Sequence, residues 1–134
     1  MDALLKVLRF KDGLIPAVIA EEGRVLVLCY MDREALRLTL ETGLVHVFRR
    51  SQGRVMLKGE TSGHTQRVLE VRPDCEGNSL LFLVEQEVAA CHAGYRTCYY
   101  RRLNAATGEL EVCEERVFDP ARVYGRSADR PRAT

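Results

Sequence analysis

The chain has 134 residues, of which 46% are hydrophobic and 29% are charged. This length supports one hydrophobic core rather than two independent domains, and the composition excludes a wholly disordered chain. The 20 basic and 19 acidic residues leave a formal charge of +1, so the overall charge does not favour nucleic acid or an acidic membrane as a partner. No apolar run reaches the roughly 20 residues of a membrane span, and the N-terminus lacks the pattern of a secretory signal. We therefore expect a cytoplasmic protein.

The apolar runs predict a mainly β domain, bordering on α+β, built as a small barrel-like or two-sheet structure with one main helix. The first strands are expected at Leu14–Ala20 and Arg24–Tyr30. The helix follows, with Asp32 as its N-cap and Gly43 as its stop. Further strands are predicted at 44–50, 54–57, 66–72, 79–86, 95–103 and 109–113. We expect one domain over residues 1–118 and a flexible tail over 119–134, where few side chains are suited to burial.

Five cysteines occur in a chain without a secretory signal, which favours metal binding or catalysis over a disulfide framework. Cys29 lies in an apolar run and Cys113 on a late strand, so both are expected to pack. The other three fall within 24 residues, and His92 adjoins one of them. Three protein ligands with an open position suit a catalytic zinc, whereas buried free thiols and a structural zinc completed by His92 are the alternatives. These three are Cys75, Cys91 and Cys98.

A turn between two predicted strands carries oxygen-bearing side chains at alternate positions, namely Asp74, Glu76 and Asn78. Oxygen ligands spaced in this way can converge on a hard cation such as Mg²⁺. An ordinary hairpin turn needs the same residue types, and on residue types alone the ordinary turn is favoured.

The segment 58–65 combines a cation, a carboxylate, hydroxyl groups, two glycines and a histidine. Exposed backbone N–H groups near Lys58 could cradle a phosphate, and Arg50 could contribute from the preceding strand end. The segment does not match the nucleotide-binding P-loop, and its alternative is a solvated connection.

Taken together, these segments resemble the phosphoribosyl-AMP cyclohydrolase family of histidine biosynthesis. The likeness covers about residues 10–101 in family order and spacing. It begins at Gly13-Leu14-Ile15-Pro16-Ala17 and is sharpest at Lys58-Gly59-Glu60-Thr61-Ser62-Gly63-His64, Asp74-Cys75 and Cys91-His92-x-Gly94-x-x-x-Cys98.

The resemblance implies a mostly β, intertwined homodimer with two metal sites. The zinc ligands would be Cys75 of one subunit with Cys91 and Cys98 of the other. Magnesium would bind at positions 74, 76 and 78, where the family usually has three aspartates. Because this chain has Glu76 and Asn78 instead, magnesium should bind more weakly. Arg49, Gln52 and Met56 replace a usual Ser, Arg and Trp, which affects the expected contacts to the substrate.

The reaction that the resemblance implies is hydrolysis of the N1–C6 bond of phosphoribosyl-AMP. Zinc would lower the pKa of bound water to about 7, and His92, or else His64, would act as general base. The alternatives are a paralogue acting on another purine nucleotide and a non-catalytic, zinc-stabilised, nucleotide-binding dimer. The substrate-binding residues expected from the matched loop and its neighbour are Lys58, Glu60, Thr61, Ser62, Gly63 and Arg50.

Overall fold

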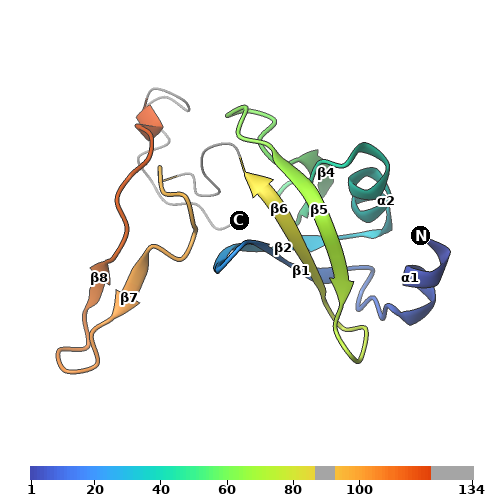
Figure 1. Ribbon diagram of the computed structural model, residues 1–134, viewed down its shortest axis with the longest axis horizontal. Coiled ribbons are helices and arrows are strands. Elements are labelled where there is room, and N and C mark those ends of the chain that lie inside the picture. Colours follow the sequence, from blue (N-terminus) through green and yellow to red (C-terminus); the bar gives the residue numbers. More distant parts are fainter. Residues whose placement is uncertain (87–92, 122–134) are drawn as a thin grey trace.

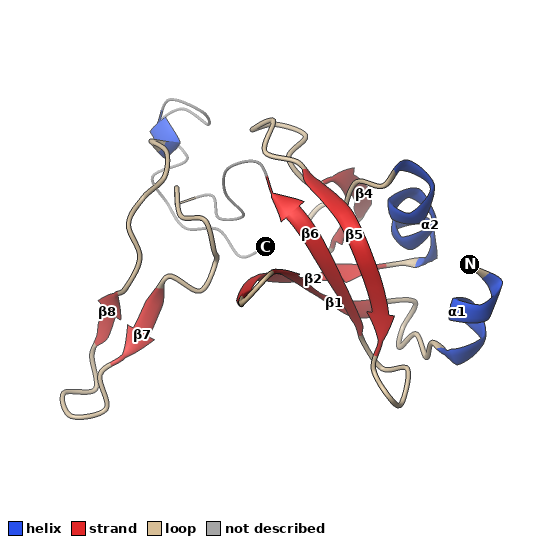
Figure 2. Ribbon diagram, in the orientation of Figure 1, coloured by secondary structure: helices blue, strands red, loops and turns tan. Residues whose placement is uncertain are grey.

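The computed structural model describes residues 1–86 and 93–121 (Figures 1 and 2). Mainly β architecture with one main helix is confirmed, and a short N-terminal helix that the sequence pattern did not predict is added. The elements in chain order are α1 (Asp2–Val7), β1 (Ile15–Glu21), β2 (Arg24–Met31), α2 (Arg33–Thr42), β3 (His46–Arg49), β4 (Arg54–Leu57), β5 (Gln66–Pro73), β6 (Leu80–Gln86), β7 (Arg101–Leu103) and β8 (Leu110–Val112).

The main sheet has the strand order β2-β1-β6-β5. Its two outer pairs are antiparallel, whereas β1 and β6 run parallel in the centre, with Ala17 opposite Leu80. Among the described strands this sheet is open, with β2 and β5 at its edges, so the predicted barrel-like closure is not seen. The hairpins β3–β4 and β7–β8 form separate two-stranded sheets.

The core lies between the main sheet, α2 and the β3–β4 hairpin. Side chains alternate along β1, so that Ile15 and Ile19 are fully buried on the core face, where Phe82 of β6 joins them. Helix α2 adds Leu36, which is also fully buried. Each such side chain contributes about 1.5–3 kcal/mol by its removal from water.

The predicted boundaries of α2 are confirmed. The Ala35 N–H donates to the Asp32 carboxylate over 2.7 Å, which satisfies one of the open donors of the first turn. The chain leaves the helix at Gly43, whose φ of 76° lies in the left-handed region that favours glycine.

The strand predicted at 109–113 is found at Leu110–Val112, whereas the strand before it differs from the prediction. A strand over 95–103 was expected, but only Arg101–Leu103 is extended, and β7–β8 projects from the molecule at the end opposite α1 and α2 (Figure 1). Because this hairpin packs little apolar surface, Leu103 and Leu110 are about 60% exposed. Cys113 follows it and is exposed, so the prediction that it packs is wrong.

Cys29 is buried as predicted, and burial raises the pKa of its thiol to about 12. Within the described residues, no helix is long and apolar enough to cross a membrane. Pro120 is buried, and residues 122–134 lie outside the described residues, so the flexible tail stays a prediction.

Candidate functional site

The turn between β5 and β6 is closed by the carboxylate of Asp74. One of its oxygens accepts the N–H groups of Glu76 (3.1 Å) and Asn78 (2.8 Å), and the other accepts the Ser79 hydroxyl (2.8 Å). The Ser79 hydroxyl, followed by the turn's backbone N–H groups, lowers the pKa of Asp74 and keeps it ionised. The three predicted magnesium positions are exposed, and Asp74 already performs the role that an ordinary turn requires.

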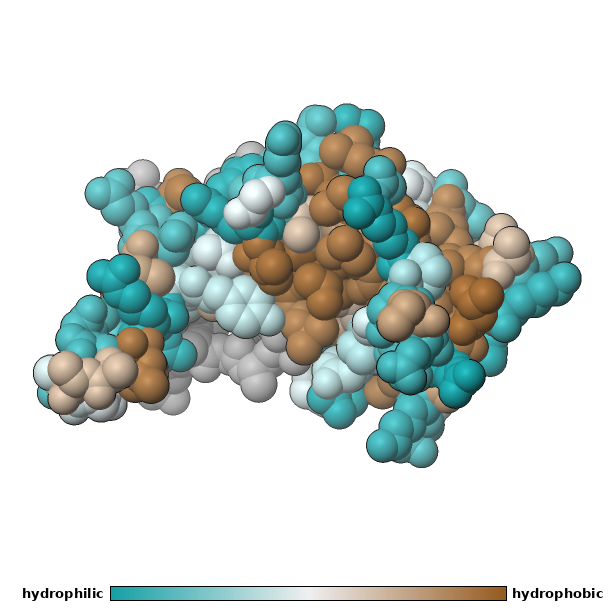
Figure 3. Space-filling model, turned by 60° about the horizontal axis from the view of Figure 1, so that its bottom comes forward, coloured by the Kyte–Doolittle hydropathy of each residue, from teal (hydrophilic) through white to brown (hydrophobic). Residues whose placement is uncertain are grey.

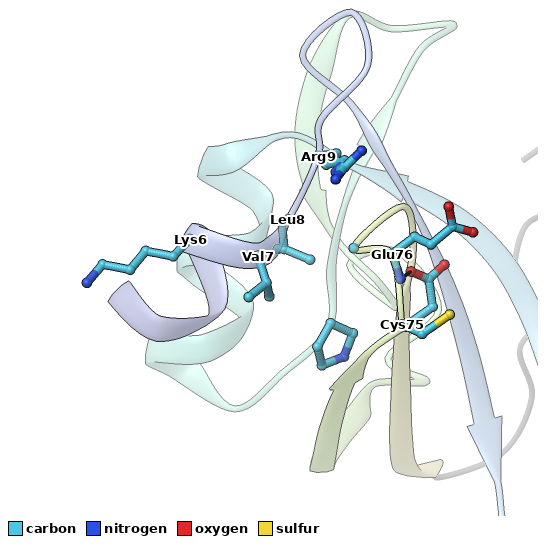
Figure 4. Close-up of a pocket in the computed structure, with 9 residues that line it drawn as sticks. Lys6, Val7, Leu8, Arg9, Cys75 and Glu76 are labelled. Carbon is cyan, nitrogen blue, oxygen red and sulfur yellow. Dashed lines mark hydrogen bonds between the residues drawn. The ribbon is translucent and has the colours of Figure 1, made fainter.

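The chain after α1 packs directly against this turn. The Arg9 N–H donates to the Gly77 carbonyl over 2.8 Å. A Cβ at Gly77, whose φ is 74°, would lie 1.8 Å from the Val7 carbonyl oxygen, so only glycine permits this approach. A hollow of about 500 Å³ lies between α1 and the turn. Cys75 and Glu76 line it from the turn with their ends directed away from α1, and Lys6 points away from the turn (Figure 4).

Cys98 is held by a β-bulge. The register between β1 and β2 shifts at Ile19/Ala20, which leaves Leu26 as the extra residue of β2. The Cys98 N–H donates to the Leu26 carbonyl over 2.7 Å, and the Thr97 hydroxyl donates to the Val25 carbonyl over 2.8 Å. The bulge therefore supplies the acceptors that fix the half-buried Cys98.

A polar network holds the residues just before Cys98. Arg96 makes a bidentate ion pair with Glu21, with N–O distances of 2.6 and 2.8 Å. This ion pair lowers the pKa of Glu21. Gln86 donates to the Arg96 carbonyl over 2.9 Å and accepts from the Gln66 amide over 2.7 Å. Gln66 is fully buried, and its Oε1 has no hydrogen-bond partner within the described part of the chain. The network links the start of β5 and the end of β6 to Cys98.

Cys75 and Cys98 lie far apart within one chain. Cys98 is bonded to the edge strand β2, whereas Cys75 follows β5, at the other edge of the sheet. Three strand spacings correspond to about 14 Å, whereas two thiolates on one zinc lie within about 4 Å of each other. Cys91 and His92 lie outside the described residues, and no three potential metal ligands converge within the described part of the chain.

The loop after β4 folds back on itself. The Gly63 N–H donates to the Gly59 carbonyl over 2.7 Å, and the Cβ that Gly59 lacks would lie 2.5 Å from the His64 carbonyl oxygen. The backbone N–H groups of Thr61 and Ser62 donate to no group among residues 1–86 and 93–121. Two adjacent open donors, three and four residues after the half-buried Lys58, are an arrangement that can bind an anion.

Two of the predicted substrate contacts already have protein partners. The Arg50 guanidinium lies over the ring of Tyr30, 4.2 Å from its centre. The Glu60 carboxylate lies 3.5 Å from the Arg54 guanidinium. Both pairs are exposed enough to rearrange at little energetic cost.

Sequence reasoning missed three described residues that belong to the candidate site, namely Gln66, Arg96 and Phe118. The ring of Phe118 contacts the ring of His64, with centroids 4.8 Å apart. Only the spatial approach of distant segments reveals these residues, since each looks ordinary among its sequence neighbours.

Comparison with known proteins gives a consistent result. Residues 27–100 match the family model described as phosphoribosyl-AMP cyclohydrolase. The phosphoribosyl-AMP cyclohydrolase of Methanocella arvoryzae is 50% identical over 117 residues, which cover 86% of this chain and 94% of the relative. That of Methanothermobacter thermautotrophicus is 52% identical over 107 residues, covering 78% and 76%. That of Nitratidesulfovibrio vulgaris is 50% identical over 115 residues, covering 84% and 90%.

Proposed function

Because the chain belongs to the phosphoribosyl-AMP cyclohydrolase family and is a hydrolase of a carbon–nitrogen bond in a cyclic amidine, we propose that it hydrolyses the N1–C6 bond of phosphoribosyl-AMP. The proposal places the enzyme in the cytoplasm and in histidine biosynthesis. It is carried by the family match over residues 27–100, which includes the loop 58–65, the turn 74–78 and the segment 91–98.

In the proposed reaction, substitution at N1 leaves the adenine ring cationic and makes C6 electrophilic. Water adds its oxygen to C6, and the N1–C6 bond breaks. A histidine accepts the proton that water releases and returns it to N1. His92 is the first choice for this base and His64 the second. His92 lies outside the described residues, whereas His64 is half-buried in the folded loop.

The substrate phosphate would bind at the loop after β4. The open N–H groups of Thr61 and Ser62, together with Lys58 at the start of the same loop, would be suitable donors for a dianion. Arg50 would add a contact to the phosphate after leaving Tyr30, whereas Glu60, after leaving Arg54, would accept from a hydroxyl group of the substrate.

Zinc would be held by Cys75 from one subunit and by Cys91 and Cys98 from the other. The donor set fits zinc because thiolates are preferred ligands, and the wide separation of Cys75 from Cys98 within one chain is consistent with a shared site. Bound zinc supplies Lewis-acid activation of the attacking water.

A homodimer also gives a role to the outer face of the main sheet. The registers place Val18, Leu28 and Leu81 side by side on that face, and Leu28 is 39% exposed. Figure 3 shows a broad apolar area on one face of the molecule. Such an area is typical of a protein–protein interface, and the wide separation of Cys75 from Cys98 within one chain favours a second copy as the occupant.

The dimer can be tested on its own by sedimentation. We expect Leu28→Glu to shift the protein towards monomer, because it would bury a charge in the interface. The control Leu110→Glu, at a residue 60% exposed on the projecting hairpin, should leave the mass unchanged. Equal sedimentation of both variants and the unmodified chain as a dimer would exclude this face.

Magnesium is proposed as a second, weaker ion at Asp74, Glu76 and Asn78. Asp74 is ionised, but its carboxylate oxygens already accept three hydrogen bonds from within the turn and from Ser79. We therefore expect magnesium to bind chiefly when the substrate phosphate supplies further oxygens.

The experiment that tests the proposed function is turnover of phosphoribosyl-AMP, followed by ultraviolet absorbance, together with zinc content. We expect turnover that is lost with a chelator and regained with zinc. Zinc without turnover would instead favour a paralogue that acts on another purine nucleotide, or a nucleotide-binding dimer. Turnover without zinc would exclude the proposed metal.

A further inference from the structure

The segment 116–120, here called the C-terminal strap, runs beside the residues that follow Cys91 and His92. The N–H groups of Val117 and Phe118 both donate to the Gly94 carbonyl, over 2.7 and 3.4 Å. An isolated β-bridge joins Tyr95 to Arg116. The strap lies beyond residue 100, where the match to the family model ends.

Gly94 explains how the strap can lie so close. Its φ is 97°, and a Cβ there would lie 2.5 Å from the Phe118 carbonyl oxygen and 3.3 Å from the ring of Pro120. Any other residue would push the strap away. The glycine of the motif Cys91-His92-x-Gly94 therefore has a specific packing role in this chain, and the buried Pro120 anchors the strap beside it.

Phe118 extends from this strap to the loop after β4. Its ring meets the His64 ring edge to face, with centroids 4.8 Å apart and planes at 78°. Such aromatic pairs add a directional attraction to simple burial. Phe118 thus connects the loop that carries His64, one candidate base, with the segment that follows His92, the other candidate base.

Within the described residues, no hydrogen bond fixes the His64 ring. Among residues 1–86 and 93–121, no group hydrogen-bonds to either ring nitrogen, and only the backbone N–H of His64 is engaged, with the Ser62 hydroxyl at 3.1 Å. Contact with Phe118 can therefore fix the ring plane while both nitrogens stay available for proton transfer.

We propose that Phe118 is a positioning residue that holds the imidazole of His64 in the orientation needed for proton transfer. The proposal rests on the proposed function and deepens it, since of the two candidate bases it selects His64, the one that Phe118 contacts, and so makes the strap part of the active site. The strap acts through His64 and does not itself touch the reacting atoms.

The test compares Phe118→Leu with Phe118→Tyr, which keeps the ring, and with Val117→Ala, which removes an exposed neighbouring side chain but keeps the strap backbone. NMR of the histidine ring protons reports the contact without substrate or zinc. The chain has only three histidines, and His64→Asn assigns the relevant signal. Kinetics with phosphoribosyl-AMP, and zinc content, are measured on the same preparations.

We expect the His64 signal to shift in Phe118→Leu and to stay in place in Val117→Ala. In Phe118→Leu, kcat should fall about 2- to 10-fold, with KM, zinc content and the pH midpoint of kcat unchanged. Phe118→Tyr should restore kcat. In a His64→Asn background, Phe118→Leu should cause no further loss, because the two residues act as one unit.

An unshifted His64 signal in Phe118→Leu would overturn the contact. A shifted signal with wild-type kcat, or additive losses in the double variant, would overturn the positioning role. Absence of turnover in the unmodified, zinc-loaded protein would instead refute the proposed function, while the NMR result would still decide the contact.

Discussion

Replacing Gly77 by alanine tests the packing of α1 against the turn that carries Cys75. Two costs are expected. The positive φ of 74° costs about 1–2 kcal/mol for an L-residue. The new Cβ would also lie 1.8 Å from the Val7 carbonyl oxygen, so α1 or the turn must move.

That movement has its own energetic cost. It breaks the 2.8 Å hydrogen bond from Arg9 to Gly77, worth about 0.5–1.5 kcal/mol. It also exposes part of Leu8, now 8% exposed, whose full burial is worth about 1.5–3 kcal/mol. The free energy of unfolding should therefore fall by about 1–4 kcal/mol more than the φ cost alone.

Gly23→Ala is the matched control, because Gly23 has a φ of 75° and no atom of residues 1–86 or 93–121 lies within 4 Å of its Cβ position. Urea unfolding followed by circular dichroism gives the free energy of each variant, and the labelling rate of Cys75 reports the turn. Equal losses in Gly77→Ala and Gly23→Ala would refute the proposed packing of α1.

Further predictions concern thiol reactivity, pH and magnesium. In the metal-free native protein, Cys29 should resist a thiol reagent until the protein unfolds, because burial raises the pKa of its thiol to about 12. The exposed Cys113 should react at once. Mass spectrometry of labelled peptides measures both reactions. The hydrogen-bonded Arg96 lowers the pKa of Glu21 in the folded state. The ionised Glu21 therefore stabilises the fold fully above its pKa in the unfolded chain, and this stabilisation is lost as the pH falls through its pKa in the folded protein. The stability difference between the unmodified chain and Glu21→Gln should therefore shrink on acidification, and a constant difference in urea unfolding would contradict this. Glu76→Asp combined with Asn78→Asp should tighten magnesium binding in calorimetry and leave zinc content unchanged.

Local sequence patterns predicted the central elements well. Helix α2 was located by its cap Asp32 and its stop Gly43, because both act on their own neighbours through hydrogen bonds and backbone conformation. The strands β1, β2 and β6 were located by apolar runs that the sheet buries. Helix α1 was missed because it has only six residues, none of them buried, and its position depends on contact with a distant turn.

Some residues of the candidate site could likewise be predicted from local sequence, and others could not. Cysteines and the turn at 74–78 stand out by residue type, and the resemblance supplied their proposed roles. Arg96, Gln66 and Phe118 could not be found in this way, since their importance comes from Glu21, Gln86 and His64 in other segments. The exposure of Cys113 was also not predictable from its strand pattern, because the β7–β8 hairpin stays away from the core.

The most direct measurement is complementation between two inactive variants, Cys75→Ser and Cys98→Ser. Each alone should lack zinc and turnover. If zinc is shared between subunits, a heterodimer of the two variants has one intact site, so random exchange of subunits should restore about a quarter of the unmodified activity on phosphoribosyl-AMP. Differently tagged chains verify that heterodimers form. Heterodimers that neither bind zinc nor turn over phosphoribosyl-AMP would contradict the shared zinc site on which the proposed function depends.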